Sequence, residues 1–298
     1  MSRHYNDVTL VTIETMYHDM ARRALEETLK RLPFKNVLIF SDKEVLPGAT
    51  HVKIEHGDML SYCTLLLKGM AEHVTTSHMI FQQWDAMVHD EYQWTDEFLD
   101  YDYIGAPWPW QSPENAVGNG GFSLRSHRLL EKLQAPHIQL DPAGEHGVQE
   151  DSYICLVHKP ELMAAGIKYA PLGLANRFSM ELWPHNDPCM AHHGVWNIVR
   201  YMPQDVVEYF IRSLPKTFWN EKHRAHHTLV MLNALGYQYL IEEQHDIIMQ
   251  SKQIDDLLGM LDATNQFKGW FTPEELRDTP APVVKKILQL LNMKDLNS

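Results

Sequence analysis

Apolar residues form two kinds of run along the first third of the chain. Short β-branched and apolar runs, typical of buried strands, cover residues 7–13, 36–40, 50–54 and 78–81. Between them, residues 18–32 and 60–74 repeat apolar side chains at helical spacing. Strands that alternate with helices of this length predict a sheet of the Rossmann type flanked by helices.

A different pattern fills residues 101–126, YDYIGAPWPWQSPENAVGNGGFSLRS. Trp108 and Trp110 stand between prolines and suit a flat platform for a sugar ring. Three glycines within residues 118–121 precede a strand predicted over 122–125, where the backbone could approach a ligand closely. A glycine-rich hairpin with aromatic side chains buried in the core is the alternative interpretation.

The rest of the chain changes character twice. Helices are predicted over 126–133 and 152–157 and a short strand over 167–170, followed by an irregular segment, 178–196, that contains His185. From residue 203 onward the pattern is helical, at 204–214, 221–235, 253–261 and 282–291, with a helix cap at Thr272. The chain is therefore predicted to have an α/β domain, 1–202, and a helical C-terminal domain, 203–298.

Composition excludes several classes of function. The chain has 298 residues, a net charge of −13 and three cysteines far apart in the sequence. The acidic balance opposes general nucleic-acid binding and a polybasic membrane anchor, and the cysteines suit neither a disulfide framework nor a zinc-thiolate site. Without a signal peptide or an apolar run long enough to span a bilayer, the sequence predicts a cytoplasmic protein. Glycine motifs for a dinucleotide or a P-loop are absent.

Candidate chemistry gathers at the ends of the predicted core elements. Polar residues follow the strands, where parallel strands would deliver them to a ligand crevice. They are Glu14, Thr15, Asp42, Asp85, Glu150, Asp151, His192 and His193. A carboxylate and an imidazole suit a divalent cation such as Mn²⁺, and a separate carboxylate could be a general base. Taken singly, each of these residues is more typical of a turn, a helix N-terminus or a loop than of a functional site.

Residues 78–85, followed by FLDYDYIGAPW and VGNGGFSLRS, resemble an uncharacterised bacterial and eukaryotic domain family that often accompanies glycosyltransferases. The similarity covers about residues 7–197. That family in turn resembles GT-A glycosyltransferases of the fringe and galactosyltransferase kind, which implies a GT-A-like α/β fold with a Rossmann-type mixed sheet flanked by helices. In such enzymes a strand ends in Asp-x-Asp, a Gly-Gly strand follows, Glu-Asp opens a helix, and a late histidine completes the metal site.

The resemblance implies a metal site for Mn²⁺ or Mg²⁺. Asp85 would bind the cation on the diphosphate side, and His193 would be the late histidine, with His192 as the alternative. Gln83 stands where the family of enzymes has its first aspartate. This departure removes one carboxylate and weakens the expectation of strict metal dependence.

The resemblance also implies the donor, acceptor and catalytic residues. Asp151, from the Glu150–Asp151 pair, would be the general base. The donor would contact Thr12, Glu14, Thr15, Asp42, Gln83, Trp84 and Asp85. The acceptor and the sugar would lie against Trp108, Trp110, Asn119, Gly120 and Gly121.

The implied function is transfer of a hexosyl or pentosyl group from a nucleoside diphosphate sugar, a UDP-sugar in particular, to a hydroxyl of a glycan or another acceptor. Inversion at the anomeric carbon is assumed, with retention left open. One alternative is a non-catalytic module that binds a nucleotide sugar or a glycan, which Gln83 favours. Another is transfer to a modified nucleobase in DNA, through a basic groove built from Arg125, Lys216, Lys222 and Arg224, which the acidic net charge opposes.

Overall fold

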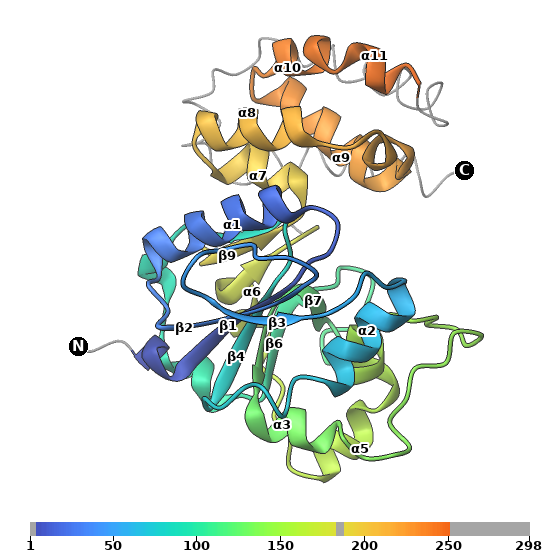
Figure 1. Cartoon of the computed structure of the whole chain (residues 1–298). Helices are drawn as coiled ribbons and strands as arrows, with labels where there is room; N and C mark the ends of the chain where they lie inside the picture. Colours follow the sequence, from blue (N-terminus) through green and yellow to red (C-terminus); the bar gives the residue numbers. More distant parts are fainter. Residues whose placement is uncertain (1–3, 183–187, 251–298) are drawn as a thin grey trace. The chain divides into compact units, whose positions relative to one another are not determined.

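The computed structural model describes residues 4–182 and 188–250 (Figure 1). The described residues up to His193 form one compact unit, and those from Gly194 onward form another. The helices predicted over 253–261 and 282–291, the cap at Thr272, and His185 lie outside the described residues. None of the helices in the described part of the chain has the length and apolar character needed to cross a membrane.

The first unit is built on a six-stranded mixed sheet in the order β3-β2-β1-β4-β7-β6. Four strands run parallel and match the predicted ones: β1 (Val8–Ile13), β2 (Asn36–Ser41), β3 (Thr50–Lys53) and β4 (His78–Gln82). Strand β7 (Val117–Ser126) is antiparallel to both β4 and β6 (Tyr103–Pro107). The predicted α/β fold with a mixed sheet flanked by helices is confirmed.

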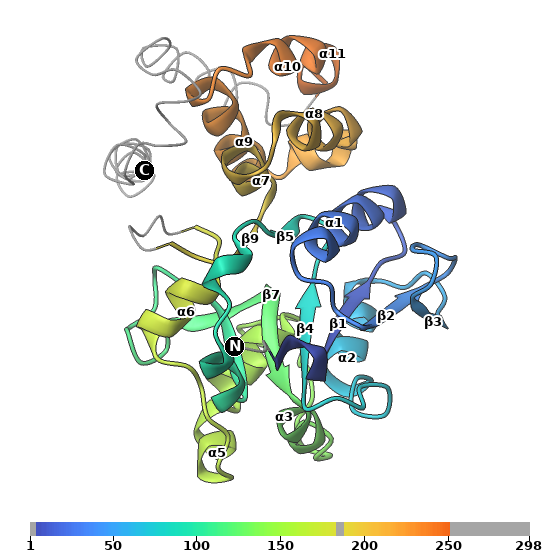
Figure 2. The same cartoon turned by 90° about the vertical axis from the view of Figure 1, so that its left-hand side faces the viewer.

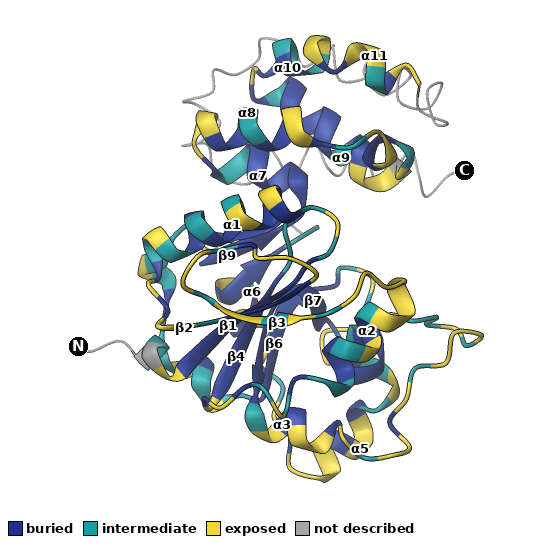
Figure 3. Cartoon of the chain, in the orientation of Figure 1, coloured by how far each residue is buried: buried dark blue, intermediate teal, exposed yellow. Residues whose placement is uncertain are grey.

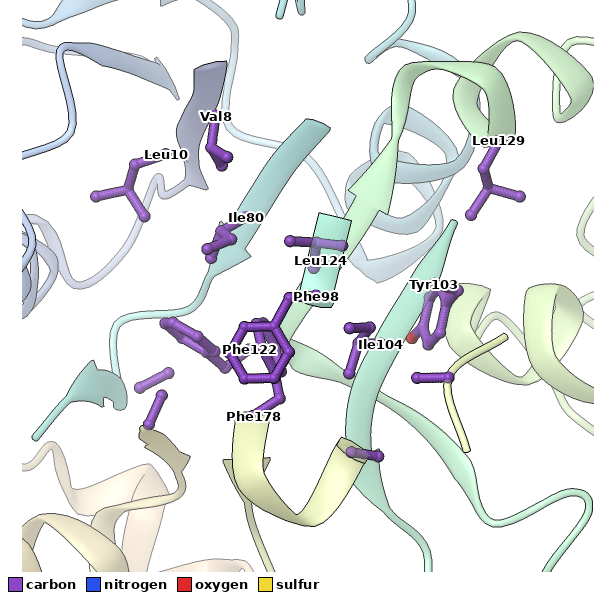
Figure 4. Close-up of a cluster of buried hydrophobic side chains, with 14 of the residues drawn as sticks. Val8, Leu10, Ile80, Phe98, Tyr103, Ile104, Phe122, Leu124, Leu129 and Phe178 are labelled. Carbon is purple, nitrogen blue, oxygen red and sulfur yellow. The ribbon is translucent and has the colours of Figure 1, made fainter. Parts of the chain in front are cut away.

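Apolar side chains cover both faces of this sheet, which is why every residue of β1 is buried (Figure 3). On one face, Leu66 of α2 (Met59–Lys68) and Leu130 of α3 (His127–Lys132) belong to one apolar cluster with Val11. On the other face, Leu25 of α1 (His18–Arg31) joins a larger cluster that includes Phe122 and Phe178 (Figure 4). Helix α1 and α3 match their predicted ranges, whereas α2 ends at Lys68, before the predicted residue 74.

A second, three-stranded sheet positions the candidate site. Strand β9 (Ala191–His193) lies beside β5 (Ala86–Val88), to which it is antiparallel (Figure 2). Its other neighbour is β8 (Ser179–Met180), to which it is parallel. The Val88 N–H donates to Thr28 Oγ1 of α1, which ties β5 to the main fold. The prediction of an irregular segment over 178–196 is therefore wrong for residues 179–180 and 191–193, which pair with each other and with the chain after β4.

Short elements complete this unit. They are the 3₁₀ helices η1 (His4–Asp7), η2 (Glu91–Gln93) and η3 (Asp96–Asp100), the helices α4 (Glu150–Ser152), α5 (Lys159–Ala164) and α6 (Leu172–Phe178), and the π-helical turn η4 (Tyr153–Val157). The helix predicted over 152–157 is thus confirmed in position. The strand predicted over 167–170 is wrong, because only Tyr169 forms a β-bridge, with Tyr103.

The described part of the second unit is helical. It contains α7 (Val195–Tyr201), α8 (Gln204–Ser213), η5 (Lys216–Asn220), α9 (Lys222–Ala234), α10 (Gln238–Glu243) and α11 (His245–Ile248). The predicted helices 204–214 and 221–235 correspond to α8 and α9. Their buried faces include Phe210 and Leu232, so this unit has apolar packing of its own.

Candidate functional site

Strand pairing brings His193 to Asp85. His193 lies opposite Ala86 in the β5–β9 pair, and Asp85 directly precedes Ala86. His193 Nε2 lies 3.3 Å from Asp85 Oδ1 and 3.0 Å from Gln83 Oε1. Asp85 and His193 are both buried, so their charges interact with little screening by water.

The other ring nitrogen of His193 faces Glu181, which directly follows β8. Glu181 Oε1 lies 3.2 Å from His193 Nδ1, and Glu181 Oε2 accepts a hydrogen bond of 2.7 Å from Asn119 Nδ2. Burial lowers the pKa of His193, but the carboxylates of Asp85 and Glu181 outweigh it and raise that pKa to about 10. Sequence reasoning missed Glu181, because the pairing of β8 with β9 brings it here and no motif marks it.

The Gly120–Gly121 dipeptide lies where β4 has ended, and larger residues would not fit there. A Cβ atom on Gly121 would lie 2.4 Å from the ring of His193. A Cβ atom on Gly120 would lie 2.8 Å from Glu150 Oε1 and 3.1 Å from Asp151 Cβ. Successive residues of a strand face opposite sides, so His193 and the acidic pair flank this dipeptide.

Backbone and side-chain donors hold the acidic pair in place. Asp151 Oδ2 accepts from the Gly120 N–H at 3.0 Å, and its Oδ1 accepts from the Ser152 N–H at 2.7 Å. Glu150 Oε1 accepts from a terminal nitrogen of Arg125 at 2.9 Å. Burial raises the pKa of Asp151 to about 7, with a further contribution from the charge of Glu150. A half-buried carboxylate with this pKa suits proton transfer near neutral pH.

Arg125 is fully buried, and its guanidinium lies over the rings of Phe81 and Tyr103. Since its charge is paired with Glu150 inside the protein, Arg125 cannot contribute to a surface groove for DNA. The prediction of Arg125 as a groove residue is therefore wrong.

Helix α2 contacts both sides of the site. The Tyr62 hydroxyl accepts from Gln83 Nε2 at 3.0 Å, so Gln83 bridges Tyr62 and His193. Burial raises the pKa of Tyr62 well above its usual value, and the charge of Glu150 raises it further. Burial and the same glutamate raise the pKa of Cys63 to about 12, so this thiol stays protonated.

The predicted donor residues meet at the carboxyl ends of β1, β2 and β4. Glu14 is buried and accepts from the N–H groups of Met16 and Tyr17 at 2.6 and 2.7 Å, which orders the start of α1. Burial raises the pKa of Glu14. Trp84 lies beside Tyr17, with ring centroids 5.1 Å apart.

Two partly exposed polar pairs lie at the same edge of the sheet. Asp42 Oδ1 lies 2.6 Å from His18 Nε2, which lowers the pKa of Asp42, and Thr15 Oγ1 lies 3.0 Å from His56 Nδ1. Asp42 and His56 keep exposed surface and could contact a ligand.

Two predicted residues lie away from these groups. The Thr12 hydroxyl donates to the carbonyl of Gln82 inside the sheet, and Thr12 is buried. The ring of His192 faces His89, with the two Nδ1 atoms 3.2 Å apart, and burial lowers its pKa well below the usual value. In β9, His192 and His193 point in opposite directions, so only His193 joins Asp85.

The two tryptophans of the 101–126 segment form a stacked pair. The ring centroids of Trp108 and Trp110 are 6.3 Å apart and their planes differ by 22°. Trp108 is buried against Gly118, whose added Cβ would lie 2.1 Å from the indole, and Trp110 is 62% exposed. Gly118 lies two residues before Gly120, whose N–H donates to Asp151.

The donors around His193 Nε2 could hold a divalent cation, which would have to displace the Nε2 proton that the raised pKa retains in the metal-free protein. Neighbouring ligands of an octahedral hard cation lie about 3 Å apart, close to the 3.0 and 3.3 Å found here to Gln83 and Asp85. An imidazole, a carboxylate and an amide oxygen suit Mn²⁺ or Mg²⁺. Within residues 4–182 and 188–250, no group of three or more His, Cys, Asp or Glu could hold a metal, so Gln83 and further oxygen ligands would complete the set.

Residues 58–193 match the model of a family described as a protein of unknown function (DUF5672). The match contains Asp85, Asp151 and His193, and excludes Glu14 and Asp42. No curated protein matches the sequence. A solved structure of a glycosyltransferase involved in the glycosylation of the major capsid of PBCV-1 aligns with 62% of this chain and 91% of that chain, at 12% sequence identity and a TM-score of 0.36. The predicted similarity to an uncharacterised family is confirmed by the first match.

Proposed function

We propose that this chain is a glycosyltransferase that moves a sugar from a nucleoside diphosphate sugar, a UDP-sugar first among them, to an acceptor hydroxyl with the help of Mn²⁺ or Mg²⁺. The observation that carries the proposal is the Gly120–Gly121 dipeptide. On one side of it lies a carboxylate with a pKa of about 7, and on the other lie donors suited to a divalent cation. Glycosyl transfer from such donors needs both groups: a base for the acceptor and positive charge for the departing diphosphate.

Asp151 takes the proton of the acceptor hydroxyl in this proposal. Each of its oxygens accepts one backbone N–H, which fixes the carboxylate and leaves lone pairs for the acceptor. The acceptor oxygen forms the new bond to the anomeric carbon as the bond to the diphosphate oxygen breaks, and the electron pair leaves with the diphosphate. Glu150 is held by Arg125, so its charge stays beside Asp151 and keeps the pKa of the base high.

Asp85, Gln83 and His193 would hold the cation, which supplies Lewis acidity toward the diphosphate oxygens when it is bound. Because Gly121 has no side chain, the backbone of β7 leaves room for the ring of His193. Thr15, Asp42 and Trp84 would contact the nucleoside, since they lie at the same edge of the sheet with accessible surface. The exposed indole of Trp110 would support a sugar ring of the acceptor.

The test is a donor screen with matched variants. The purified protein is incubated with UDP-sugars, GDP-sugars and other nucleotide sugars, with Mn²⁺, Mg²⁺ or EDTA, and thermal stabilisation and release of nucleoside diphosphate are followed. We expect metal-dependent stabilisation by one class of nucleotide. Release should be lost in Asp85→Ala and kept in Asp100→Ala, which changes an exposed aspartate of η3. No stabilisation and no release with any donor would refute the proposal.

A non-catalytic module that binds nucleotide sugars or glycans is the second candidate, favoured by Gln83 in place of a carboxylate. The Asp151→Asn variant separates the two. An enzyme should lose turnover while it still binds the donor, whereas a module should bind equally well and show no turnover in either form. A modified nucleobase as acceptor is a third outcome, which would show as DNA binding that weakens steeply with salt.

A further inference from the structure

Glu181 lies between the imidazole of His193 and Asn119, whose side chain also accepts from the backbone of β7. The Gly121 N–H donates to Asn119 Oδ1 at 3.0 Å, and Asn119 Nδ2 donates to Glu181 Oε2 at 2.7 Å. The second oxygen of Glu181 lies 3.2 Å from His193 Nδ1. The side chain of Glu181 is 14% exposed, so this connection is shielded from water.

This arrangement determines which ring nitrogen of His193 faces the candidate cation. Nδ1 faces Glu181, whereas Nε2 faces Asp85 and Gln83. A histidine that binds a metal through one nitrogen usually donates the other N–H to a carboxylate, which fixes the tautomer and the plane of the ring. Glu181 stands in that place, on the opposite side of the ring from the donors of the cation site.

We propose that Glu181 is a positioning residue, which accepts the Nδ1–H of His193 and so presents Nε2 to a divalent cation held together with Asp85 and Gln83. The inference rests on the cation part of the proposed function. Glu181 would act through His193 and would not itself bind the cation, because both of its oxygens are engaged elsewhere.

Binding of Mn²⁺ alone tests this inference without any donor or acceptor. The full chain is titrated with MnCl₂, and free Mn²⁺ is followed by electron paramagnetic resonance, in buffer and again with UDP. The variants are Glu181→Ala, Glu181→Gln and His193→Ala. Glu161→Gln is the matched control, since Glu161 also accepts from two side chains, His137 and His158, at 3.0 and 3.1 Å. Circular dichroism confirms that each variant is folded.

We expect the Kd for Mn²⁺ to rise at least about tenfold in Glu181→Ala. Glu181→Gln should lie between Glu181→Ala and the wild type, because its one remaining oxygen can satisfy only one of the two donors. Glu161→Gln should bind as the wild type does. Equal binding by Glu181→Ala and the wild type, with loss in His193→Ala, would overturn the inference.

Two further outcomes separate the inference from the proposed function. Absence of Mn²⁺ binding in the wild type, both in buffer and with UDP, would overturn the inference together with the cation site. Weaker Mn²⁺ binding in Glu181→Ala would support the inference even if no sugar donor were turned over, an outcome that would refute the proposed transferase alone.

Discussion

Replacing Asp151 with asparagine should remove activity, and its effect on the stability of the fold should be more favourable above neutral pH than in acid. Burial raises the pKa of Asp151 from 3.8 to about 7. Because this pKa is higher in the folded protein than in the unfolded chain, the stabilisation due to the protonated form is complete below the unfolded pKa and is lost as the pH rises through the folded value. Between about pH 5 and about pH 8, ionisation of such a group would cost about 3 kcal/mol, which solvent screening of the half-exposed side chain reduces to about 2 kcal/mol.

Asparagine is neutral at every pH and escapes this cost. Its single side-chain oxygen can accept from only one of the two N–H groups, those of Gly120 and Ser152, that the carboxylate accepts from. The lost hydrogen bond costs about 1–3 kcal/mol. That cost is nearly the same at both pH values, so it cancels when the effect of Asp151→Asn at one pH is subtracted from the effect at the other.

Urea unfolding of the wild type and Asp151→Asn at the two pH values measures this difference. We expect the free energy of unfolding of the variant, relative to the wild type, to be about 2 kcal/mol higher at about pH 8 than at about pH 5. Asp102→Asn is the opposite control, because the hydrogen bond with Arg128 helps to outweigh burial and lowers the pKa of Asp102. Relative to the wild type, the Asp102→Asn variant should lose more stability at high pH than in acid. An effect of Asp151→Asn that does not change with pH would refute the assignment of a raised pKa.

Three further predictions concern other parts of the site. Gly121→Ala should lower the melting temperature and abolish Mn²⁺-dependent stabilisation, because the new Cβ would lie 2.4 Å from the ring of His193, whereas Gly173→Ala, with open space around it, should do neither. Trp110→Ala should raise the acceptor KM by roughly two- to tenfold with donor binding unchanged, as expected for loss of one exposed aromatic contact, measured by initial rates. Gln83→Glu should tighten Mn²⁺ binding, measured by titration, and destabilise the metal-free protein, measured by thermal unfolding, because it adds a negative charge beside the site. Equal affinity of the variant and the wild type for Mn²⁺ would exclude Gln83 as a ligand.

Strands with a pattern of their own could be predicted from the sequence. The four parallel strands are buried on both faces and appear as continuous apolar runs, with bounds close to those observed. Strands β5, β8 and β9 have three, two and three residues, too few to show any periodicity. Their existence depends on partners far away in the sequence, which local patterns do not reveal. The strand predicted over 167–170 failed for the opposite reason. These residues have the pattern of a strand, but only Tyr169 finds a partner, in a single bridge with Tyr103.

The candidate site also contains some residues that the sequence order reveals and others that only distant strand pairing brings together. Asp85, Asp151 and His193 were identified because their order along the chain resembles a known arrangement. Glu181 reaches His193 only through the pairing of β8 with β9, so no spacing in the sequence points to it. The rule that residues at the end of a strand face a ligand failed for Thr12, because its hydroxyl donates to a carbonyl of the neighbouring strand.

Gln83 shows how geometry changes the meaning of a substitution. From the sequence alone, a glutamine in place of aspartate removes a ligand and favours a protein without catalysis. In the structure, its amide oxygen lies 3.0 Å from His193 Nε2 and its nitrogen donates to Tyr62, so the amide is held in place from two sides. A carboxylate here would be a third negative charge around one imidazole, after Asp85 and Glu181. An amide keeps an oxygen donor at that position without the repulsion, so Gln83 is compatible with a cation site in which Asp85 supplies the carboxylate ligand and Glu181 lies on the far side of the ring.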